Sequence, residues 1–136
     1  MMMSQYIIIK SYNGKYLSIS QNGKIMFDKY NNKESDTLIM NYIGRYITLK
    51  TKSGKYLSAT TNGTVEVDKD RAGSNERFEI EWLDNDWFTL KSNYGYYFTI
   101  QKDGKLDANQ KDIGPNEKFS LIEQKVESLF DFLNFF

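Results

Sequence analysis

Apolar and polar residues alternate with a period of two in many short segments of this sequence. Clear examples, each with one polar residue in between, are the pairs Ile47/Leu49, Val65/Val67, Phe78/Ile80 and Phe88/Leu90. Such alternation is typical of a β-strand with one buried face. Asn-Gly, Ser-Gly and Asp-Gly pairs stand between these segments, and glycine at such places favours tight hairpin turns. The pattern predicts short strands joined by tight turns, with no helix before residue 124.

The pattern repeats three times along the chain. Gly14, Gly54 and Gly95 stand in the related segments YNGKYLS, KSGKYLS and NYGYYFT, with spacings of 40 and 41 residues. Each has a lysine four residues before it, a second glycine nine residues after it, an acid 22 after it and a large apolar residue 24 after it. Chance does not produce the same offsets in three ungapped units. We therefore predict three repeats, at about residues 5–44, 45–85 and 86–124.

Each repeat holds four predicted strands, which gives twelve strands in an all-β domain. Four strands per repeat are also typical of a propeller blade, but a propeller closes with at least about four blades. Three four-stranded units around a threefold axis predict a β-trefoil over residues 1–124, followed by a short apolar tail at 125–136. The predicted core comprises Ile9, Leu17, Leu38, Leu49, Leu57, Phe78, Leu90, Phe98 and Phe119.

The composition limits the function. The 18 basic and 18 acidic residues cancel, so no net charge draws the chain to nucleic acid. Cysteine and histidine are absent, which removes thiolate ligands, the commonest general base and the commonest metal ligand. No motif pairs a nucleophile with a base, so we expect a non-enzymatic protein without cofactor or metal. The first ten residues lack a signal-peptide pattern and no apolar run reaches the roughly 20 residues that span a bilayer, so we expect a cytoplasmic protein.

The repeat resembles that of the fascin-like β-trefoils, a family that includes fascin and the hisactophilins. The second repeat carries the resemblance best, in residues 48–58, in Gly63 and in residues 75–80. The resemblance covers about residues 5–123. It implies a β-trefoil that binds filamentous actin or another protein of the cytoskeleton, in the cytoplasm or at the cell cortex. A carbohydrate-binding, lectin-like trefoil is the alternative, because β-trefoils host many activities.

Two sets of repeated side chains are candidates for binding. The first is one lysine per repeat, which together could form a ring of charge for an acidic partner: Lys10, Lys50 and Lys91. The second is one tyrosine per repeat, whose ring could stack on a sugar: Tyr16, Tyr56 and Tyr97. A strand lysine also lays its stem over apolar surface and blocks edge pairing, and the tyrosines adjoin core positions. We prefer the structural interpretation of both sets and retain the lysines as candidate contacts.

Residues 68–79 partly match a calcium-binding loop. Acids stand at its first, third and twelfth positions and a glycine at its sixth. However, Ala72 occupies a position that needs an oxygen ligand, and predicted strands flank the segment where the motif requires helices. We expect no calcium site there.

The tail has a pattern of its own. Residues 126, 129, 130 and 133 are apolar and follow the spacing of one face of a short helix. Burying a large apolar side chain is worth roughly 1.5–3 kcal/mol, so we expect the tail to be ordered against the barrel or against another copy of the chain. A contact with a membrane or with another partner is the alternative. The candidate contacts are Phe130, Leu133 and Phe136.

The absence of histidine leads to a first prediction. No side chain of this composition has an ordinary pKa between about 6 and 8. The affinity for any partner should therefore change little between about pH 6 and pH 7.5. Calorimetric titration at the two pH values measures this. A large change would require a carboxyl group with a strongly raised pKa and would contradict the prediction.

Overall fold

The structure, a computed structural model of the chain, describes residues 4–124. These residues form twelve strands: β1 (Ser4–Ser11), β2 (Tyr16–Ile19), β3 (Ile25–Lys29), β4 (Leu38–Ile43), β5 (Tyr46–Thr51), β6 (Tyr56–Ala59), β7 (Val65–Lys69), β8 (Phe78–Trp82), β9 (Phe88–Lys91), β10 (Tyr97–Ile100), β11 (Leu106–Gln110) and β12 (Phe119–Gln124). Three short 3-10 helices lie between them: η1 (Ser74–Glu76), η2 (Asp84–Asp86) and η3 (Pro115–Glu117). The predictions for the tail, with Phe130, Leu133 and Phe136, fall outside the described residues.

Six of the strands close into a ring. Antiparallel pairing joins β1 to β4, β4 to β5, β5 to β8, β8 to β9, β9 to β12, and β12 back to β1. The last of these contacts brings the first and the last strand of the described chain together, with Tyr6 opposite Gln124 and Ser11 opposite Phe119. A ring of strands removes the open edges that a flat sheet would leave.

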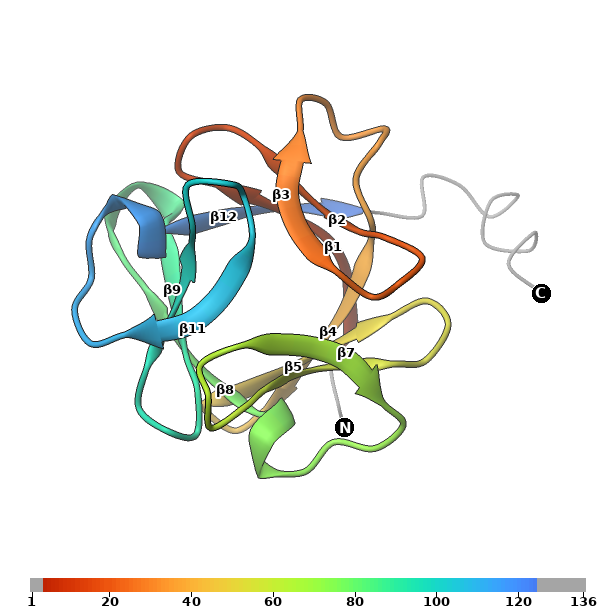
Figure 1. Cartoon of the computed structure of the whole chain (residues 1–136), viewed down its shortest axis with the longest axis vertical. Helices are drawn as coiled ribbons and strands as arrows, with labels where there is room; N and C mark the ends of the chain where they lie inside the picture. The colour runs from red at the N-terminus through yellow and green to blue at the C-terminus, as the bar shows by residue number, and fades with distance from the viewer. Residues whose placement is uncertain (1–3, 125–136) are drawn as a thin grey trace.

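The other six strands form three hairpins, β2–β3, β6–β7 and β10–β11, arranged around a central threefold axis (Figure 1). The tip of one hairpin contacts the strand of another. The Ala108 N–H donates to the Gly63 carbonyl over 2.8 Å, and the Phe27 N–H donates to the Gly104 carbonyl over 2.7 Å. Gly63 has φ of +82°, and a Cβ there would lie 2.8 Å from the Cβ of Asn109. Glycine is required here by conformation and by close approach.

One cluster of buried apolar side chains draws on all twelve strands. Every residue of the predicted core belongs to it and is at most 3% exposed, so that prediction is confirmed. The rings of Phe78 and Phe98 meet edge to face, with 4.7 Å between their centroids. Aromatic rings favour this geometry electrostatically. The predicted all-β trefoil with four strands per repeat is confirmed as well.

The acid that recurs in each repeat joins a loop to a hairpin. Glu76 accepts a hydrogen bond from the Ser58 hydroxyl of β6 and another, over 2.8 Å, from the Gly73 N–H. Glu117 makes the same two kinds of bond in the third repeat. Asp36, with a shorter side chain, accepts from a backbone N–H of β2 instead. Because Glu76 and Glu117 are buried, the acid at this position has a structural explanation.

Replacing Phe78 with Ala should lower the free energy of unfolding by about 3–5 kcal/mol, because it leaves a cavity in a closely packed core. Phe78 is 0% exposed. Chemical denaturation of the variant measures the loss. The matched control is Tyr30→Ala, since Tyr30 is 80% exposed and should change stability by less than about 0.5 kcal/mol. Equal effects of the two substitutions would contradict the assignment of the core.

Replacing Glu76 with Ala should cost about 1–3 kcal/mol, because a buried hydroxyl and the Gly73 N–H lose their shared acceptor. Glu66 lies exposed on the neighbouring strand β7, so Glu66→Ala removes the same side chain without that loss. Thermal melting of both variants at neutral pH gives the comparison. A Glu76 variant as stable as the Glu66 variant would show that the carboxylate contributes nothing to stability.

Candidate functional site

The three candidate lysines each lie over one of the repeated tyrosines. The Nζ atoms of Lys10 and Lys50 are both 5.6 Å from the ring centroids of Tyr16 and Tyr56. In the third repeat the distance from the Lys91 Nζ to its tyrosine ring is 5.7 Å. In every repeat the lysine and the tyrosine stand directly opposite each other on paired antiparallel strands. These are cation–π pairs between cross-strand neighbours, which explains why both residue types recur at fixed spacing.

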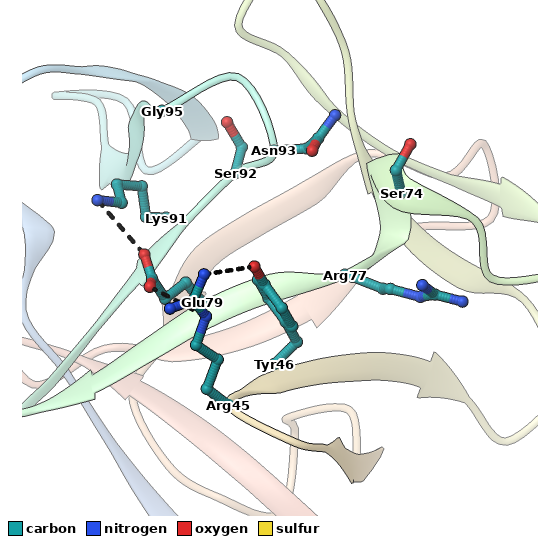
Figure 2. A pocket seen from close by; sticks show the side chains of 9 residues that line it. All are labelled: Arg45, Tyr46, Ser74, Arg77, Glu79, Lys91, Ser92, Asn93 and Gly95. Atoms are coloured by element: carbon teal, nitrogen blue, oxygen red, sulfur yellow. Dashed lines mark hydrogen bonds and ion pairs between the residues drawn. The ribbon is translucent and has the colours of Figure 1, made fainter.

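Lys91 also lines a cleft, which lies between the second and third repeats and has a volume of about 360 Å³ (Figure 2). Its lining residues are Arg45, Tyr46, Ser74, Arg77, Glu79, Lys91, Ser92, Asn93 and Gly95. Ligand pockets in proteins are commonly about 300–1,000 Å³, so this cleft has the size of a small binding site.

The register of three paired strands determines which residues form the floor of the cleft. Tyr46 on β5 pairs with Glu79 on β8, and Glu79 pairs with Lys91 on β9. Residues directly opposite each other on antiparallel strands point to the same face, so the three side chains form one row across the sheet. Arg45 precedes β5 in the turn from β4, and Arg77 lies between η1 and β8. The turn from β9 to β10 forms the remaining wall.

Three cations and one carboxylate line this cleft, a net charge of +2. Lys91 and Arg45 lie beside the carboxylate, whereas the Arg77 side chain extends away from it (Figure 2). Glu79 is 3.3 Å from the Lys91 Nζ and 3.8 Å from the Arg45 Nε. Arg45 also donates a hydrogen bond to the Tyr46 hydroxyl over 3.0 Å and lies over its ring (Figure 2). The hydrogen bond to Tyr46, together with the charges of Tyr46 and Glu79, raises the pKa of Arg45 above its usual value. Its positive charge is therefore constant over the physiological pH range.

The Arg77 guanidinium has no hydrogen bond or ion pair with any residue of the described range 4–124. It is exposed and lines the same cleft. A guanidinium presents five N–H donors in a planar fork that matches a carboxylate or phosphate. The arrangement can bind an anion, with Arg77 as the available donor, and Ser74 and Asn93 add polar groups to the same cleft.

Comparison with known proteins agrees with this architecture. Residues 28–121, more than half of the chain, match the sequence model of the fascin domain. The chain belongs to the fascin domain family. A solved structure described as a designed 3-fold symmetric protein, ThreeFoil, superposes with a TM-score of 0.75 at 18% identity, covering 88% of this chain and 99% of that one. At this identity the likeness shows the fold, a β-trefoil. No curated protein sequence matches the chain.

Sequence reasoning missed Arg45 and Arg77 in this fascin domain. It looked for residues that recur, whereas Arg45 interrupts the repeat: aligned on the three turn glycines, it corresponds to Gln5 and Asp86. Arg77 corresponds to Thr37 and Lys118, so a basic residue stands at this position in two of the three repeats. Departures from the threefold pattern, such as Arg45, are the signal that could have found the cleft. Which of them meet in space depends on how neighbouring repeats pack, and the sequence spacing alone does not contain that information.

The acidic side chains within residues 68–79 of this fascin domain contact different partners. Asp68 is 3.7 Å from the Lys69 Nζ, and Asp70 pairs with Lys55. Within residues 4–124 no group of three or more acidic side chains converges in a way that could hold a metal ion. Over the same range no helix is long and apolar enough to cross a membrane.

Proposed function

We propose that this fascin domain is a non-enzymatic binding protein of the actin cytoskeleton. The observation that supports the proposal is the match of residues 28–121 to the fascin domain. The β-trefoil architecture, with its exposed turns and loops between strands, is compatible with a role in binding. The working location is the cytoplasm, at the cell cortex or along actin filaments. Nucleic acid is not a partner in this proposal, because the chain has no net charge.

The chemistry of the cleft supports a binding role over a catalytic one. Its only carboxylate, Glu79, is engaged by Lys91 and Arg45, and the chain has neither histidine nor cysteine to act as base or nucleophile. Three cations and several hydroxyl and amide groups are suited to holding a ligand by charge and hydrogen bonds. No metal or cofactor is part of the proposal.

Crosslinking of filaments would need a second contact besides the trefoil. The apolar tail at 125–136, with Phe130, Leu133 and Phe136, is the segment that we propose for self-association. The basis is its composition, since six large apolar side chains follow the third repeat. A dimer formed this way would present two copies of the same trefoil surface to neighbouring filaments.

Co-sedimentation with filamentous actin tests the proposal. The protein should pellet with filaments in a saturable manner at physiological salt and should stay in the supernatant without them. A protein of similar size and near-zero net charge, with no affinity for actin, serves as the control for non-specific trapping by filaments. Absence of saturable pelleting at actin concentrations of tens of micromolar would contradict actin binding.

A carbohydrate-binding trefoil is the second candidate. The cleft supports it, because Ser74, Asn93 and the Tyr46 ring combine polar groups and an aromatic ring in a volume that accepts a sugar. A glycan array measures this directly. Selective binding to one class of glycan, together with no co-sedimentation with actin, would favour the lectin function over the cytoskeletal one.

A further inference from the structure

The threefold repeat creates three equivalent junctions between neighbouring repeats. At each one the first turn of a repeat approaches a strand of the preceding repeat, and the positions can be matched by aligning Gly14, Gly54 and Gly95. The cleft described above is the junction of the second and third repeats. Because the backbones are equivalent, differences among the three junctions come from side chains.

The other two junctions have different chemistry. Where the third repeat meets the first, Tyr12 packs on Trp87 with 5.4 Å between ring centroids. These two residues are the equivalents of Asn93 and Tyr46. An aromatic pair therefore stands where the junction of the second and third repeats has an open polar cleft. The junction of the first and second repeats has a cleft of about 340 Å³ whose charged lining residues are one lysine and one aspartate. Three cations line the cleft between the second and third repeats, against one in the cleft between the first and second.

We propose that this cleft binds carboxylates of a short acidic peptide segment in a protein partner. Arg77 is the primary contact, since its guanidinium is exposed and unpaired within residues 4–124 and can take a carboxylate in a bidentate manner. Arg45 is the second contact. Its hydrogen bond to Tyr46 orients it in advance, and its 3.8 Å approach to Glu79 is longer than a hydrogen bond.

The distribution of charge favours a short peptide over an extended polyanion. The net charge of the whole chain is zero, so the positive potential is local to the cleft. Glu79 stands between the cations, and a smaller adjoining cleft of about 220 Å³ carries Glu81 beside Glu79 and Lys91. A nucleic acid or an anionic membrane would meet these two carboxylates along its path. A segment of two or three neighbouring Asp or Glu side chains can contact this cleft alone, so it meets Glu79 but not Glu81.

Glu79 has a specific part in this proposal. It occupies Lys91 and the nearest atoms of Arg45, so an incoming carboxylate competes with it for the same donors. Removing its charge while keeping its shape, as Glu79→Gln does, changes the net charge of the cleft from +2 to +3. The affinity for an acidic peptide should therefore rise.

The test uses a fluorescein-labelled hexaglutamate peptide and the full chain, with fluorescence anisotropy at low and physiological salt. Wild-type protein should bind with an affinity that falls as salt increases. Arg77→Glu should weaken binding by at least about tenfold, as expected for loss of a charge-assisted hydrogen bond. Glu79→Gln should strengthen it by about twofold to fivefold, in line with an exposed ion pair. Far-ultraviolet circular dichroism confirms that each variant keeps the fold.

The matched control is Arg71→Glu. Arg71 is exposed, carries the same charge, lies six residues before Arg77 and is outside the cleft lining. It should change the affinity by less than about twofold. If Arg71→Glu and Arg77→Glu weakened binding equally, the loss would be explained by the net charge of the protein alone, and the proposal would be overturned. Absence of peptide binding at millimolar protein would also overturn it, as would displacement of the peptide by inorganic phosphate or phosphatidylserine vesicles at lower concentration than free hexaglutamate.

The inference rests on the proposed function only in taking the ligand to be part of a protein. The peptide titration contains no actin, so it succeeds or fails independently of co-sedimentation. If wild-type protein binds the peptide and does not pellet with filaments, the cleft proposal stands and actin is not the partner. If the protein pellets with filaments and Arg77→Glu has no effect on the peptide titration, the cleft proposal is wrong and actin binding stands.

Discussion

The apolar face of one repeat can be buried only against the other two. Each repeat contributes two strands to the closed ring and one hairpin to the group around the threefold axis, and none of these elements encloses a core alone. The edge-to-face contact of Phe78 with Phe98 joins the second repeat to the third, and the pairing of β1 with β12 joins the third to the first. Stability, register and the position of every loop follow from this mutual burial.

The same constraint separates structural residues from functional candidates. A side chain that recurs in all three repeats meets a structural requirement that occurs three times. Examples are the lysine–tyrosine pairs and the acid of each loop, which is Asp36, Glu76 or Glu117. Residues that interrupt the pattern are not required by the repeated packing. Arg45 is such a residue, and it lines the same junction as Arg77. In a pseudosymmetric fold, a binding site is therefore to be sought where the symmetry of side chains fails while that of the backbone holds.

The sequence was informative about the fold because a β-trefoil depends on short-range periodicity. Alternation at period two identified buried positions such as Leu57 and Phe119, and the glycine spacing located the hairpin tips that approach other strands closely at Gly63 and Gly104. The cleft was not predictable in the same way. Tyr46, Glu79 and Lys91 are far apart in sequence, and strand register alone places them in one row.

The amino-acid sequence by itself determined the all-β class, the threefold repeat and the core. The reason is that hydrophobic alternation and turn-forming residues act locally, and three such units bury their apolar faces only by packing against one another. The tertiary structure decided which charges neutralise one another and which remain available. Lys10 and Lys50 lie on tyrosine rings, whereas Arg77 lines a cleft and is unpaired within the described chain. That difference arises from distances of a few ångströms between strands of different repeats, to which Coulomb and hydrogen-bond energies are sensitive and sequence spacing is not.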